Sequence, residues 1–248
     1  MKRFVILVLT LACAISCHQE GKNILVLTEK GGIHEPFVEA GLQWLDSLAK
    51  EKSYSLTVIN DTEPMNATSL KGYDLIIQLN YPPYMWTDEA AASFIDYIED
   101  GWGSWIGFHH ASLLGEFDGY PMWEWASEFL GDIVYENYIP ELSDGEVRVE
   151  ALDHPVMKGV PASFTLPDDE WYIYNRSPRN KVTVLANVNE DSYTTDTQVK
   201  MGDHPVIWTN TKVRARNIYF QMGHSPKLFH NPNFTRMLEN AIVWSMED

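Results

Sequence analysis

Two adjacent histidines at the end of a predicted strand are the residues of this chain best suited to chemistry. They lie in the stretch Gly107–Phe108–His109–His110–Ala111, which follows the apolar run 104–108 and precedes a helical segment. A strand that turns sharply into a helix is where α/β hydrolases present a nucleophile, with small residues around the turn. Because histidine occupies the exposed position here, the pattern predicts an enzymatic site without ordinary covalent acyl transfer.

More polar side chains follow other predicted strands. His34 and Glu35 come after the first strand, and Tyr81 comes after the third. His224 follows the predicted strand 217–221. In open α/β sheets, ligands bind beyond the carboxyl ends of the strands. We therefore expect these side chains to meet the histidine pair at one edge of the sheet.

An acidic segment, Asp168–Asp169–Glu170–Trp171–Tyr172, supplies carboxylates next to two aromatic side chains. Histidine with a carboxylate supports general acid/base catalysis, in which imidazole works near its own pKa. The same groups can also hold a divalent metal. The sequence has no HxH or HExxH spacing, so metal binding depends on long-range convergence. Acid/base chemistry is the preferred interpretation, and the metal stays open.

Apolar and helical segments alternate at the spacing of βαβ units. This predicts an α/β fold with a doubly wound, mostly parallel sheet and helices on both faces. No repeat, low-complexity tract or linker interrupts the pattern, so residues 23–248 are expected to form a single domain. Strands are expected at 23–28, 55–60, 75–79, 104–108, 147–151, 181–188, 204–208 and 217–221, and helices at 36–52, 88–100, 123–130 and 231–246.

The first residues are typical of an export signal. A basic start precedes the apolar run 4–15, which is too short to span a bilayer comfortably. A small residue before Cys17 resembles a lipobox, so we expect a lipoprotein signal over 1–17, lipidation of Cys17 and a tether over 18–22. A plain secretory signal is the alternative. Because Cys13 lies inside the signal, the mature domain is expected to have no disulfide and no thiol nucleophile.

These expectations place the protein in the cell envelope, on the periplasmic side or in the outer membrane, with the lipid anchor as its only membrane contact. The formal charge is −17, with 35 acidic and 18 basic residues. Such a surface repels phosphate backbones, so nucleic acid is not an expected partner. The sequence leaves the oligomeric state open, and a homo-oligomer is one alternative.

The aromatic content favours a carbohydrate ligand. Nine tryptophans and twelve tyrosines exceed what a core of this size needs, and exposed ring faces stack on apolar faces of sugars. A small-molecule sugar is therefore the expected partner. The candidate stacking walls are Tyr81, Trp123, Trp171 and Tyr172.

The order and spacing of these motifs resemble the ThuA-like (trehalose-utilisation) family, a branch of the class I glutamine amidotransferase-like, flavodoxin-like fold. The resemblance extends from Ile24 to Trp244; its motifs are His34–Glu35, Gly103–His109, Asp153–Pro155, Asp169–Tyr172 and Gly223–His224. In true amidotransferases a cysteine stands where this chain has His109, and a glutamate stands where it has Lys227. Glutamine hydrolysis is therefore not expected.

The resemblance implies carbohydrate catabolism, with a keto-sugar or keto-glycoside as substrate. A ketone acidifies the neighbouring C–H bond, which suits proton abstraction by a histidine/carboxylate pair. His109 or His110 is the expected base, and Glu170 is its acid or orienting partner. His224, His34 and Glu35 are expected to contact the substrate, and no cofactor is certain. If zinc or manganese binds, the candidate ligands are His34, His109, His224 and Glu170.

Two other functions remain open. One is a non-catalytic carbohydrate-binding lipoprotein, which would need the aromatic side chains but not the histidine cluster. The other is a metal-dependent sugar hydrolase, which predicts stoichiometric metal in the purified protein.

Overall fold

The computed structural model describes residues 21–247 of the 248 in the chain. The expected signal, Cys17 and most of the tether lie outside the described residues. Within that described range, no helix is long and apolar enough to cross a membrane.

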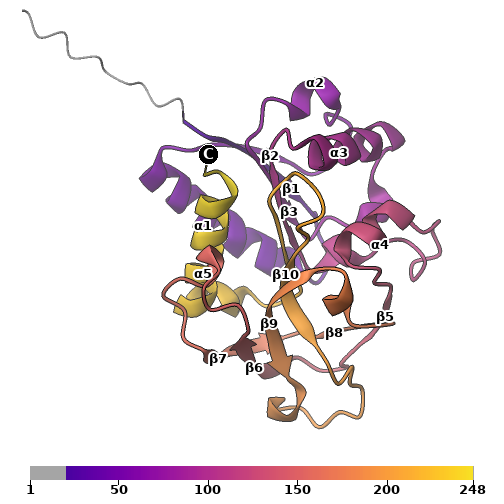
Figure 1. Ribbon diagram of the computed structural model, residues 1–248, viewed down its shortest axis with the longest axis vertical. Helices are drawn as coiled ribbons and strands as arrows, with labels where there is room; N and C mark the ends of the chain where they lie inside the picture. The colour runs from indigo at the N-terminus through magenta and orange to yellow at the C-terminus, as the bar shows by residue number, and fades with distance from the viewer. Residues whose placement is uncertain (1–20, 248) are drawn as a thin grey trace, which may run out of the picture.

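Nine strands form one mixed sheet in the order β2-β1-β3-β4-β11-β10-β9-β6-β7 (Figure 1). The first five in this order pair in parallel. From β11 onward the pairs are antiparallel. The strands are β1 (Asn23–Thr28), β2 (Ser55–Ile59), β3 (Leu75–Leu79), β4 (Ser104–Phe108), β6 (Ser143–Val149), β7 (Ser163–Asp169), β9 (Thr183–Asn189), β10 (Pro205–Thr209) and β11 (Asn217–Phe220).

Helices cover both faces of the parallel half. On one face, α1 (Glu35–Lys52) and α5 (Pro232–Ser245) pack against side chains such as Ile24 and Val26. On the other face, α2 (Ala67–Leu70), α3 (Asp88–Asp100) and α4 (Glu124–Leu130) cover the side chains that alternate with these along the strands, such as Leu25 and Leu27. Figure 1 shows α1 and α5 on the opposite side of the sheet from α3 and α4. Short 3-10 helices are η1 (Pro83–Met85), η2 (His109–Ser112), η3 (Pro155–Met157), η4 (Pro178–Asn180), η5 (Glu190–Ser192) and η6 (Pro226–His230).

The α/β class and the helices on both faces are confirmed. Thr87 caps α3, as its sequence indicates, and its side-chain oxygen accepts a hydrogen bond from Ala90 N. The antiparallel arm is less predictable: β7 was not expected, and neither was the separate two-stranded sheet of β5 (Tyr135–Tyr138) and β8 (Tyr172–Tyr174).

The turn after β4 is tighter than the sequence indicates. The predicted helical segment is a single 3-10 turn, η2, and His109 at its start has a φ of 44°. A positive φ is rare for a residue with a side chain and is strained unless its surroundings hold it. Two hydroxyls do so here: Ser112 Oγ donates to the His109 carbonyl at 2.9 Å, and Tyr219 Oη lies 2.9 Å from the same oxygen. The strand-to-turn elbow therefore presents a histidine.

Gly107 has no room for a side chain. A Cβ at this position would lie 2.0 Å from Cζ2 of Trp105. We expect Gly107→Ala to lower the free energy of unfolding by about 1–3 kcal/mol, because overpacking displaces the indole. Urea denaturation measures this loss. If the clash is the cause, the loss in Gly107→Ala/Trp105→Phe is smaller than the sum of the two single losses; strictly additive losses would contradict it.

Candidate functional site

Four side chains from distant parts of the chain converge on one point. Oε2 of Glu170 lies 3.1 Å from His109 Nε2, 3.8 Å from His34 Nε2 and 3.7 Å from His224 Nδ1. One nitrogen or oxygen atom from each of the four residues lies within 4.8 Å of the others. We call these four residues the histidine cluster. All four were candidate site residues from the sequence, and the structure brings them together.

The parallel strands position the three imidazoles. His34 ends the loop after β1 and precedes α1, His109 follows β4 directly, and His224 follows β11. Because β1, β4 and β11 run in parallel within one sheet, their carboxyl ends lie at the same edge. Glu170 comes instead from the antiparallel arm, between β7 and β8.

Asp169 connects that arm to the parallel half. Its carboxylate accepts backbone hydrogen bonds from Gly223 N at 3.1 Å, His224 N at 2.9 Å and Glu170 N at 2.9 Å. Asn80 Nδ2 adds a 2.6 Å hydrogen bond to the Gly223 carbonyl. The loops that carry Glu170 and His224 are thus held by one buried carboxylate.

The hydrogen bonds of His109 define its tautomer. Nδ1 lies 2.8 Å from the carbonyl oxygen of Gln221, and a carbonyl can only accept, so Nδ1 carries the proton. In a neutral imidazole the other nitrogen then has a lone pair, and here Nε2 faces the Glu170 carboxylate at 3.1 Å. Burial lowers the pKa of His109 to about 3, which disfavours the doubly protonated form. Two acceptors therefore face each other.

Two further nitrogens of the cluster are buried without a hydrogen-bond partner, His34 Nε2 and His224 Nδ1. Four ligands around a tetrahedral metal at about 2.1 Å lie about 3.4 Å from one another. The three distances from Glu170 Oε2 span 3.1–3.8 Å, on either side of that value. The cluster therefore fits a divalent metal held by three imidazoles and one carboxylate. The backbone carbonyl on His109 Nδ1 is the outer partner that metal-bound histidines usually have.

A second group lies beside the first. His110 Nδ1 is 3.1 Å from Glu29 Oε2, and His34 Nδ1 is 3.9 Å from the same oxygen. The rings of His34 and His110 are 4.1 Å apart. His110 keeps some exposure, whereas His109 has none. A Glu29–His110 pair is thus available for proton transfer next to the histidine cluster.

Electrostatics differ across the cluster. Burial raises the pKa of Glu170, but the three imidazoles around its carboxylate outweigh burial and hold that pKa well below the usual range. Burial lowers the pKa of His34. For His224, burial also lowers the pKa, but the Glu170 carboxylate outweighs this effect and the net shift is upward. Glu170 is therefore the permanent negative charge of the site.

Most of the aromatic residues predicted to stack on a sugar lie in the core instead. Trp171 is fully buried and its Nε1 donates to the Ser143 carbonyl at 3.0 Å. Tyr81 is buried, and Trp123 packs among other aromatic rings of the core at 5.5 Å from Trp86. Tyr172 does reach the cluster and stacks on His109 at 3.9 Å, but it is covered. This corrects the prediction for Tyr81 and Trp171, which are buried and present no free ring face; Trp123 is partly exposed, and its role stays a prediction.

Glu35 is exposed in the first turn of α1, one residue beyond His34. Three residues important to the geometry were not predicted: Glu29, Asp169 and Gln221. Asp169 belongs to the acidic segment that the sequence singled out, but no local pattern distinguishes a carboxylate that faces a histidine, such as Glu29, from one that faces solvent. Gln221 acts through its backbone carbonyl, which no side-chain pattern reveals.

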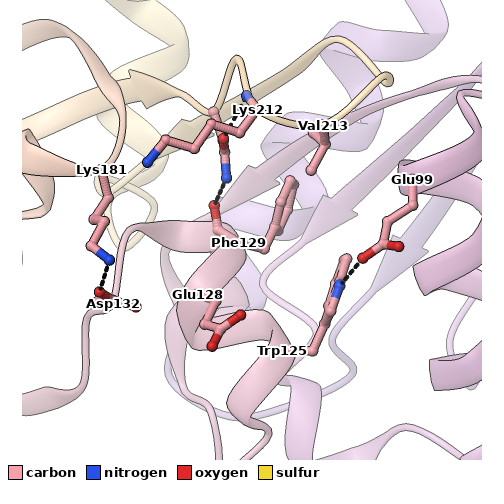
Figure 2. A pocket seen from close by; sticks show the side chains of 9 residues that line it. Glu99, Trp125, Glu128, Phe129, Asp132, Lys181, Lys212 and Val213 are labelled. Carbon is pink, nitrogen blue, oxygen red and sulfur yellow. Dashed lines mark hydrogen bonds and ion pairs between the residues drawn. The ribbon is translucent and has the colours of Figure 1, made fainter.

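A cavity of about 330 Å³ lies elsewhere, near α4. Figure 2 shows Trp125, Glu99 and Lys181 around it, with Trp125 Nε1 donating to Glu99 at 2.6 Å. None of its lining residues belongs to the histidine cluster.

The Asp169 contacts generate a stability prediction. Asp169→Ala leaves three N–H groups without their acceptor, and we expect a loss of about 3 kcal/mol or more in the free energy of unfolding, measured by urea denaturation. The adjacent Asp168 is the control, because its side chain is exposed and pairs with Lys227 at the surface. Asp168→Asn is expected to change stability by less than about 1 kcal/mol. Equal losses in both variants would contradict the role given to Asp169.

Comparison with known proteins agrees with this geometry. A model of the ThuA family, described as trehalose utilisation, matches residues 23–245. No curated protein matches the chain. A solved ThuA-like protein from Bacteroides uniformis is 31% identical, with a TM-score of 0.80, and the match covers 90% of this chain and 91% of that one.

Two more distant structures share the fold. A ThuA-like protein from Parabacteroides merdae is 13% identical, with a TM-score of 0.65 and coverage of 92% and 90%. The glutaminase domain of CTPS from Trypanosoma brucei is 9% identical, with a TM-score of 0.52 and coverage of 90% and 94%. On the family match and the relative from Bacteroides uniformis, the chain belongs to the ThuA (trehalose utilisation) family.

Proposed function

We propose that this protein is a divalent-metal-dependent enzyme of carbohydrate catabolism that acts on a keto-sugar or keto-glycoside. The observation that carries the proposal is the lone pair of His109 Nε2, which faces the Glu170 carboxylate at 3.1 Å. A cation between these two acceptors turns a repulsive contact into shared coordination. The unpartnered nitrogens of His34 and His224 point to the same ion.

Charge balance supports a divalent ion. Glu170 and Glu29 both flank His34, and the three imidazoles of the cluster are neutral when they act as ligands. Histidine with one carboxylate suits zinc or manganese. If such an ion bound there and expanded to five-coordinate, a carbonyl oxygen of the sugar could take the fifth position, and the ion would stabilise negative charge that develops on that oxygen.

The proton-transfer role falls to His110. His109 is fully buried, its Nδ1 donates to the Gln221 carbonyl, and its Nε2 lone pair faces Glu170 rather than a substrate. His110 is partly exposed, and the Glu29 carboxylate lies 3.1 Å from its Nδ1, so Nε2 is the nitrogen left for the substrate. His110 Nε2 then takes the proton from the carbon next to the ketone. The resulting enediolate leads to isomerisation or to β-elimination of the glycosidic bond.

Metal content tests the first half of the proposal. We expect purified protein loaded with zinc or manganese to retain about one equivalent after gel filtration. Glu170→Gln removes the charged ligand and is expected to weaken metal affinity by at least about 100-fold, measured by competition with a chromogenic chelator. Glu35→Gln is the matched control, because this exposed carboxylate lies outside the cluster. A wild-type protein that retains no metal, or equal affinities for both variants, would refute the site.

Solvent deuterium tests the second half. We expect metal-loaded protein to incorporate deuterium from D2O next to the ketone of a 3-keto-glycoside, detected by NMR or mass spectrometry. His110→Asn is expected to lower this exchange by about 100-fold or more while metal content stays the same. A hydrolase would release sugar without exchange at carbon. A binding protein would give neither product nor exchange.

A further inference from the structure

Several exposed apolar side chains lie in segments that follow the parallel strands β1, β3 and β4. Ile33, which is 70% exposed, directly precedes His34, and Met85 lies in η1 after β3. Phe117 and Tyr120 are 57% and 52% exposed and lie in the loop between η2 and α4. Apolar groups gathered on a polar surface mark a binding region more often than chance exposure does.

The loop 115–120 places its two rings on different neighbours. Tyr120 stacks on Tyr84 of η1, with ring centroids 4.8 Å apart and planes 11° from parallel. Phe117 meets Tyr135 of β5 edge to face at 4.7 Å. One short loop therefore joins η1 to β5. We call Tyr84, Phe117 and Tyr120 the aromatic rim.

Ring contacts connect the aromatic rim to the histidine cluster. Tyr135 meets Tyr172 at 4.7 Å, and Tyr172 stacks on His109 at 3.9 Å. On the other side, burial raises the pKa of Tyr84 to about 12, and the charges of Asp118 and Glu29 add to the rise. Phe117 lies two rings beyond the ring that covers His109.

The loop is held in shape before any ligand binds. Gly115 O accepts hydrogen bonds from Tyr120 N at 2.9 Å and from Asp118 N at 3.2 Å, and Trp123 N donates to Leu114 O at 2.9 Å. Gly115 has a φ of 118°, which only glycine adopts without strain. Rings fixed in this way lose little conformational freedom when a ligand stacks on them.

We propose that the aromatic rim is a stacking subsite for the second ring of a disaccharide or glycoside whose first ring occupies the histidine cluster. Sugars combine apolar faces with hydroxyl edges, and the rim offers exposed rings beside the exposed Asp118 carboxylate, which accepts hydroxyl protons. This inference rests on the proposed function for the position of the first ring.

Calorimetric titration of the metal-loaded protein tests the rim, with trehalose, maltose and sucrose as probes and glucose as the one-ring comparison. We expect at least one disaccharide to bind more tightly than glucose. Phe117→Ala and Tyr120→Ala should each weaken that disaccharide by about tenfold and leave glucose affinity and metal content within about twofold of wild type. Leu152→Ala, an equally exposed apolar side chain outside the rim, should change neither affinity.

Three results would contradict the stacking subsite. The first is that the wild type binds no disaccharide, and the second is that both rim variants bind the disaccharide within about twofold of wild type. The third is that the wild type is a dimer and both rim variants are monomers. The last result would make these side chains a subunit interface. If metal removal leaves the disaccharide affinity of the wild type and its loss in the rim variants unchanged, the stacking subsite is still supported. The metal proposal is judged separately, by metal content and Glu170→Gln.

Discussion

The carboxylate of Asp169 fixes the spacing on which the site depends. It is the chain neighbour of Glu170, and two of the three N–H groups it accepts belong to Gly223 and His224. The same group therefore sets the position of a carboxylate and of an imidazole that approach each other across the sheet. Burial raises the pKa of Asp169 to about 7, against the effect of the N–H donors, so the contact is obtained at an electrostatic cost. Such an unfavourable burial of a carboxylate is typical of functional sites, where the position of the neighbouring groups is important.

The two halves of the sheet have different tasks. The parallel half has the glutamine amidotransferase-like architecture and delivers three imidazoles to one edge, one of them from the strained turn at His109. The antiparallel arm adds the negative charge, because Glu170 lies where β7 ends and β8 begins. In α/β hydrolases such a strand-to-turn elbow presents a nucleophile. Here it presents His109, whose two nitrogens face the Gln221 carbonyl and the Glu170 carboxylate. In the proposed mechanism, proton transfer therefore falls to its neighbour, His110.

Periodicity and polar loop residues were enough to predict the parallel half and the meeting of its histidines, because carboxyl ends of parallel strands share an edge. The arm was harder. β7 contains Pro167, which an edge strand tolerates but which reads as an interruption, and its pairing with β6 is set by contacts far along the chain. Trp171 failed as a stacking residue for a related reason: an aromatic beside acids has the same local pattern whether it lines a pocket or fills the core.

The origin of the ligands from residues 34 to 224 has a consequence for biogenesis. A chain that has emerged only as far as β4 holds two imidazoles and no carboxylate partner, and one without β11 lacks the last ligand and the donors that retain Asp169. Coordination is therefore available only to the finished tertiary structure. Under the proposed metal site, a bound ion would lower the free energy of the native state alone, and metal supply in the cell would then set how much of the newly made protein persists.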